Sequence, residues 1–159
     1  MMTRPATAPS VLLATTSAAQ TTGISNGDPV KFDTVTYSSG ADISLTGGTY
    51  TFNLKANHPY ILNGQVNTAN FSTLNVNAYV TAAWYDTTST ATQIGQTCTT
   101  LSVTDTLLGS GGSPVCMTVF APTVDSTVQL RITGVSGLNQ LGSSNAMPTA
   151  ILQELSGAQ

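Results

Sequence analysis

Apolar and polar residues alternate along most of the chain after residue 28, as they do in strands that bury one face. In the segment TYTFNLK, one face carries Tyr50, Phe52 and Leu54, and the other carries Thr and Asn. The longest alternation runs over 72–86, where one face is formed by Leu74, Val76, Ala78, Val80, Ala82 and Trp84. This period of two predicts β-strands, and no segment shows a convincing helical period.

Turn residues separate the alternating segments. The clearest are Asn-Gly-Asp-Pro at 26–29, Thr-Gly-Gly at 46–48, Asn-His-Pro at 57–59 and a Gly/Ser-rich stretch at 109–114. Between them we expect about nine or ten strands. Strands at this spacing predict an all-β, antiparallel β-sandwich, and the number fits a jelly roll of two packed sheets.

The later strands are predicted near 115–120, 126–133 and 149–155. In the first of these, Val115, Met117 and Val119 share a face. In the last, Ile151 and Leu155 share one face, and Leu152 lies on the other.

Residues 1–27 lack the alternation. They begin with a Pro/Ala/Thr-rich stretch and continue with small polar residues up to Gly27. This composition predicts an extended N-terminal arm. The jelly-roll domain is therefore expected to span 28–159.

Charge is scarce: the 159 residues include 4 Lys and Arg, 7 Asp and Glu and one His, against 44 Ser and Thr. A net charge of −3 and the lack of a basic stretch argue against a nucleic-acid partner. No apolar run approaches the roughly 20 residues that a membrane span needs, so no membrane partner is expected. A weakly charged, hydroxyl-rich surface favours self-association.

Residues suited to catalysis or metal binding are few. A nucleophile needs a base, and the single histidine, His58, precedes Pro59 in a turn where we expect it to face solvent. Asp residues occur singly at turns and strand ends, which suits turn formation better than paired acid–base chemistry. Two Cys and one His lack the usual zinc spacing, and Asp42 with Ser44 or Asp86 with Thr87 offers little for calcium. We expect no catalytic residues, no cofactor and no metal.

The two cysteines, Cys98 and Cys116, fall in neighbouring predicted strands. A disulfide fits this placement. Two buried thiols that act as small apolar side chains fit it as well, and the sequence leaves both open.

The order of several short motifs resembles a known family. NGDPVKFDTV, ISLTGGTYTFNL, a long strand ending in AAWYD, VQLRITG and a C-terminal AMPTAILQEL follow one another as in the trimeric jelly rolls of the tumour-necrosis-factor and complement-globular-head type. Within that group, the chain is most similar to the versions found in bacteriophage virion proteins and spore-surface fibres. The resemblance covers roughly residues 28–156. The chain differs from the spore fibres in that its sequence has no collagen-like stalk.

The resemblance implies a homotrimeric capsid decoration, or cement, protein on the exterior of a virion. Its partner would be the major capsid protein of a virus. We expect the arm to contact the capsid through its one charged group, Arg4, and through the bulky apolar run Val11, Leu12 and Leu13. We expect the trimer interface to include Tyr79, Tyr85, Phe120 and Leu152.

A binding module is the alternative. The chain would then be the receptor- or glycan-binding tip of a viral or spore-surface fibre. It would use the loops at 86–92, 105–114 and 134–146, with Tyr79 and Tyr85 as stacking platforms for a glycan. An enzyme is a remote third reading, because the chain is short of histidine and of paired carboxylates.

Overall fold

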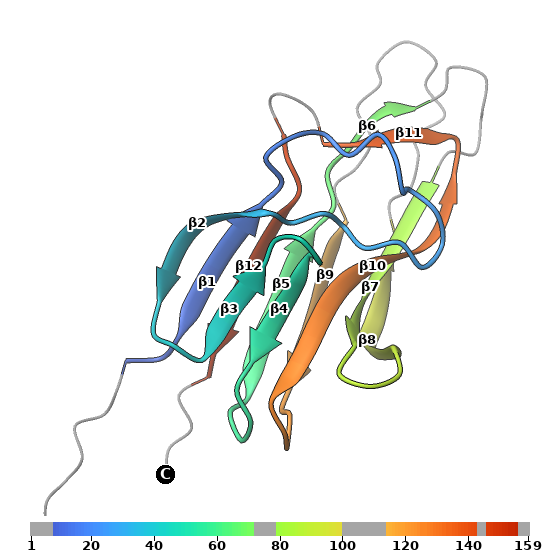
Figure 1. Ribbon diagram of the computed structural model, residues 1–159. Helices are drawn as coiled ribbons and strands as arrows, with labels where there is room; N and C mark the ends of the chain where they lie inside the picture. The colour runs from blue at the N-terminus through green and yellow to red at the C-terminus, as the bar shows by residue number, and fades with distance from the viewer. Residues whose placement is uncertain (1–7, 72–78, 100–113, 143–145, 156–159) are drawn as a thin grey trace, which may run out of the picture.

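A computed structural model of the chain describes residues 8–71, 79–99, 114–142 and 146–155 (Figure 1). These ranges contain twelve strands. Among the described residues, no helix is long and apolar enough to cross a membrane. The strands are β1 (Val11–Thr15), β2 (Thr34–Ser39), β3 (Ile43–Thr46), β4 (Thr51–Leu54), β5 (Tyr60–Gln65), β6 (Thr68–Phe71), β7 (Tyr79–Asp86), β8 (Thr92–Thr99), β9 (Val115–Phe120), β10 (Ser126–Ser136), β11 (Leu138–Leu141) and β12 (Thr149–Glu154).

Ten of these strands form two five-stranded antiparallel sheets. Sheet I has the order β2-β1-β12-β5-β9, and sheet II has the order β3-β4-β10-β7-β8. The short strands β6 and β11 form a separate two-stranded sheet at one end of the sandwich (Figure 1). The predicted all-β sandwich of two packed sheets is confirmed.

The core lies between the two sheets and is built from the buried faces of the alternating strands. Its centre is aromatic: the ring centroids of Phe52 and Trp84 are 5.8 Å apart, and those of Phe32 and Phe52 are 5.7 Å apart. The indole Nε1 of Trp84 donates a hydrogen bond of 2.9 Å to the carbonyl oxygen of Cys116. This bond satisfies the one polar group of a fully buried ring and ties sheet II to sheet I.

Gly64 in β5 permits the close approach of the two sheets. A Cβ atom at this position would lie 2.7 Å from Cδ2 of Leu130 and 3.1 Å from the Trp84 ring. A real side chain there would push the sheets apart, so the position requires glycine because of packing.

The prediction of an extended N-terminal arm over residues 1–27 is wrong for Val11–Thr15. Residues Val11–Thr15 form β1, which pairs with β12 on one side and with β2 on the other. Leu12 and Ala14 are buried in the core. The strand was missed because Val11, Leu12, Leu13 and Ala14 are all apolar, and a strand that is apolar on both faces has no period of two.

The alternation of Val30, Phe32 and Val35 with polar residues predicts a strand near 30–35, but the strand in this region lies farther along the chain. Strand β2 begins at Thr34, whereas Val30 and Phe32 lie before it with their side chains fully buried. The backbone of Val30 bonds to Leu130, with its N–H 2.9 Å from the carbonyl oxygen. The apolar pattern therefore identified core residues correctly but placed the strand too early.

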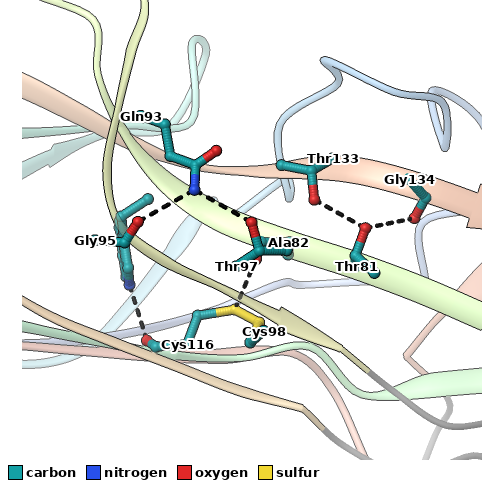
Figure 2. Close-up of a disulfide and its surroundings, with 10 residues drawn as sticks. Thr81, Ala82, Gln93, Gly95, Thr97, Cys98, Cys116, Thr133 and Gly134 are labelled. Carbon is teal, nitrogen blue, oxygen red and sulfur yellow. Dashed lines mark hydrogen bonds between the residues drawn. A yellow bond between two sulfur atoms is a disulfide. The ribbon is translucent and has the colours of Figure 1, made fainter.

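Cys98 and Cys116 form a disulfide (Figure 2). Their Cα atoms are 5.1 Å apart, within the usual range for a bridge. Cys98 lies in β8, the edge of sheet II, and Cys116 lies in β9, the edge of sheet I. The bridge therefore closes one open side of the sandwich, and it decides between the two interpretations of the cysteines.

Reducing this disulfide is expected to lower the free energy of unfolding by about 3 kcal/mol, because the bridge restricts the unfolded chain over a loop of this size. The two cysteines are 18 residues apart in sequence. Urea unfolding of the same preparation with and without a phosphine reductant measures the change. The Cys98→Ser/Cys116→Ala variant is the control, since its midpoint should not respond to reductant. An unchanged wild-type midpoint, or two thiols alkylated without prior reduction, would rule the stabilising bridge out.

Candidate functional site

The outward face of sheet I carries large apolar side chains. In β9, Cys116 is buried, whereas Val115, Met117 and Val119 are 54%, 64% and 62% exposed. In β12, Ala150 and Leu152 are buried, whereas Ile151 is 43% exposed. The alternation that fills the core with one set of residues therefore presents the other set to solvent.

Strand register brings these side chains together in rows, because residues paired across an antiparallel sheet point to the same side. The central row runs across all five strands and consists of Tyr37, Leu13, Ile151, Asn63 and Met117. A second row consists of Ser39, Val11, Gln153, Ile61 and Val119. A third consists of Thr34, Thr15, Thr149, Gln65 and Val115. We call these three rows the apolar face.

The apolar face contains no charged residue. Its apolar members come from every strand of sheet I, and the rest are Ser, Thr, Asn or Gln. Monomeric proteins rarely expose large apolar patches, and such patches among polar residues mark interaction surfaces. The absence of charge lowers the cost of removing the face from water.

Two of the four predicted trimer-interface residues point into the sandwich. Leu152 is fully buried in the core, and Phe120 is half-buried and packs against the core. Leu152 therefore does not reach an outward surface, and its neighbour Ile151 faces outward instead. The run Ala-Ile-Leu is apolar at successive positions, so the sequence does not indicate which member faces the core.

The other two predicted interface residues lie in β7 of sheet II. Tyr79 is exposed, and the guanidinium of Arg131 lies 5.7 Å from the centroid of the Tyr85 ring. Arg131 also donates from Nε to Oε1 of Gln129 over 2.8 Å. This face of sheet II is therefore polar and carries a cation, unlike the apolar face.

Three of the four predicted capsid-contact residues belong to the sandwich and not to a free arm. Val11 and Leu13 lie in two rows of the apolar face, and Leu12 lies in the core. Arg4 lies outside the described residues. The apolar face was not predicted from the sequence. The one indication of it in the sequence is the shared strand face of Val115, Met117 and Val119.

A polar cluster gathers at the end of the sandwich where β1 begins and β12 ends. The backbone N–H of Ser10 donates to Oε2 of Glu154 over 2.8 Å, and its hydroxyl donates to Oδ2 of Asp42 over 3.1 Å. Nδ1 of His58 lies 2.7 Å from Oε1 of Glu154. His58 is thus partly exposed, as expected of a turn residue, but it is held by a carboxylate.

The electrostatics of the cluster are those of a negative site. Burial opposes the charge of Glu154, but the hydrogen bonds from Ser10 and the contact with His58 outweigh it and lower the pKa of the carboxyl. The pKa of the Tyr60 hydroxyl rises to about 12, mainly through burial and then through the nearby charges of Asp42 and Glu154.

This cluster does not have the arrangement of a nucleophilic triad. The Ser10 side chain is fully buried, so a substrate cannot reach it. Its hydroxyl donates to the carboxylate of Asp42, whereas an activated serine would donate to the imidazole.

Solved structures provide the comparison for this architecture. Murine APRIL at pH 5.0 superposes with a TM-score of 0.67 at 13% identity, covering 93% of this chain and 100% of that chain. Eiger TNF from S. frugiperda superposes with a TM-score of 0.66 at 13% identity, covering 96% of each chain. The fold is a TNF-like jelly roll.

Sequence comparison adds no family assignment. No model of a known protein family matches the chain, and no curated protein matches it. At 13% identity, the likeness to APRIL and Eiger TNF establishes the TNF-like fold and nothing about activity or partners.

Proposed function

We propose that this TNF-like jelly roll is a non-enzymatic structural protein. In this proposal it assembles as a homotrimer through the apolar face and decorates the exterior of a viral capsid. The observation that carries the proposal is the apolar face, which spans five strands without a charged residue. Its occupant is a neighbouring copy of the same chain, because TNF-like folds usually form trimers.

Burial of the apolar face supplies the driving force for assembly. Fully removing one Val, Leu, Ile or Met side chain from water contributes roughly 1.5–3 kcal/mol. The face offers several such side chains per copy, and they include Val115, Met117, Val119 and Ile151. A closed ring of three copies covers this surface, whereas a monomer leaves it in water.

The proposal that the trimer decorates a capsid is supported by the order of sequence motifs, which resembles that of virion jelly rolls. A trimer presents the same capsid-binding surface three times. Three linked contacts bind more tightly than one, since the second and third form at high effective concentration. Stabilisation of the head by a bound trimer would need no catalytic group.

The reading frames that flank the gene give the first test of the capsid role. A neighbouring major capsid gene supports decoration, whereas a tail or lysis cassette contradicts it. We then expect the purified protein to saturate capsids assembled from that capsid protein in multiples of three chains per site, measured by co-sedimentation. Binding as single chains, or no binding, would contradict the proposal.

One observation favours the alternative of a glycan-binding tip. Tyr79 and Tyr85 lie on the outward face of sheet II, and the Tyr79 ring is available for stacking on a sugar. A reproducible glycan ligand on an array, lost in the Tyr79→Ala variant, would place this function above decoration.

A further inference from the structure

Three side chains that the assembly role leaves unused meet in the polar cluster. Asp42 lies in the connection from β2 to β3, His58 lies in the connection from β4 to β5, and Glu154 ends β12. Their potential ligand atoms, a ring nitrogen and carboxylate oxygens, all lie within 4.8 Å of one another. Three segments far apart in sequence therefore direct metal-binding groups to one point.

Backbone hydrogen bonds hold each of the three segments in place. The N–H of Lys55 donates to the carbonyl oxygen of Asp42 over 3.0 Å, and that of Glu154 donates to Ser10 over 2.8 Å. The N–H of Leu155 donates to the carbonyl oxygen of Pro59 over 2.7 Å. The ligand atoms thus belong to a preformed site.

Ser10 has the position of an outer-shell residue in a metal centre. It donates one hydrogen bond to Oε2 of Glu154 and another to Oδ2 of Asp42. Metal-binding carboxylates are usually held in this way by groups that do not touch the ion. Since Ser10 engages one oxygen of each carboxylate, it orients both toward His58.

The charge of the site calls for a cation. Two carboxylates approach each other, and only one imidazole lies with them. The ammonium group of Lys55 forms its ion pair with Asp125, at 2.7 Å, and interacts with Asp42 only through the longer-range Coulomb attraction between their charges. His58 is 41% exposed at its side chain, so the cluster is open to solvent on the histidine side.

We propose that Asp42, His58 and Glu154 bind a transition-metal dication of the Zn²⁺ type. One imidazole nitrogen and two carboxylate oxygens form a ligand set that zinc accepts, with water at the remaining position. Calcium is disfavoured, since it takes six to eight oxygen ligands. Binding of the ion replaces the direct contact between His58 and Glu154.

The bound ion would fasten one end of the sandwich. Ser10 precedes β1 and Glu154 ends β12, and these two strands are neighbours in the middle of sheet I. Zinc should therefore raise the melting temperature of the protein, because it binds the folded chain and not the dispersed ligands of the unfolded chain.

The test uses untagged full-length protein, stripped with a chelator and titrated calorimetrically with ZnCl₂. We expect one ion per chain, a higher melting temperature and, with Co²⁺ in place of Zn²⁺, a visible d–d absorption band. His58→Ala and Glu154→Gln should each weaken zinc binding by more than the roughly 10–100-fold typical of losing an outer-shell partner. Asp86→Asn, which removes a carboxylate outside the cluster, should bind like the wild type.

The Glu154→Gln variant keeps the size and much of the hydrogen bonding of the glutamate, so its metal-free melting temperature verifies folding independently. Zinc binding that is unchanged in both folded variants would overturn the proposal. Tighter binding of Ca²⁺ than of Zn²⁺ would overturn the assignment of the metal class, and no stoichiometric binding would overturn the site. None of these results bears on the trimer, whose formation rests on a different face.

Discussion

Replacing Ile151 with lysine is expected to convert the proposed trimer into monomers that remain folded. Ile151 lies in β12, the middle strand of sheet I, and in the central row of the apolar face. In the assembled protein, each copy would bury an ammonium group with no partner. Burying this unpaired charge costs about 3 kcal/mol per copy, so the association constant falls by more than about 100-fold at each interface. Light scattering at micromolar concentration, together with a melting curve, measures both parts of this result.

The folded state should tolerate the same substitution, since the Ile151 side chain is 43% exposed in the single chain and lies outside the core. Val124→Lys is the matched control. Val124 is 60% exposed, but it lies between β9 and β10 and outside the rows of the apolar face. An Ile151→Lys protein with the mass of the wild type would show that assembly uses another surface. Loss of assembly in Val124→Lys would show that the effect is not specific to the face.

Deleting residues 1–20 is expected to abolish cooperative folding, whereas deleting 1–7 leaves the sandwich able to fold. The longer deletion removes β1, which separates β2 from β12 in sheet I. Shortening a single buried leucine such as Leu12 to alanine costs about 2–5 kcal/mol, and a whole domain is stable by only about 5–15 kcal/mol. The loss of every buried contact of β1 should therefore cost more than the whole free energy of unfolding of the domain.

Circular dichroism and urea unfolding of the two truncated proteins measure this prediction. The shorter truncation keeps Ser10 and every residue of β1, so it serves as the control for loss of the N-terminus itself. A truncation of 1–20 that unfolds cooperatively near the wild-type midpoint would show that the residues behave as the arm expected from composition. Only the 1–7 deletion is expected to retain a folded domain. It is therefore the variant with which the contribution of the N-terminus to capsid binding can be measured.

Alternation identifies core residues correctly where one face is apolar and the other polar. In the segment TYTFNLK, Phe52 and Leu54 face the core as expected, whereas Tyr50 lies in the turn before β4. The prediction failed where both faces are apolar, as at Leu12 with Leu13 and at Ile151 with Leu152. Side-chain order alone does not distinguish the core face from an assembly face in such strands, because both bury apolar groups.

The polar cluster was beyond sequence reasoning for a different reason. His58 and Glu154 are 96 residues apart, and neither belongs to a motif with metal-ligand spacing. Sheet topology brings them together, since β12 and β5 are neighbours in sheet I and each residue lies at or beside the end of its strand. The apolar face arises in the same way, from residues of five strands whose register only the folded chain reveals.

The mass of the wild-type protein in solution tests the central claim most directly. The chain has a mass of 16.3 kDa. Light scattering or native mass spectrometry at micromolar concentration should report three times this mass. A monomer of 16.3 kDa under these conditions would contradict the account.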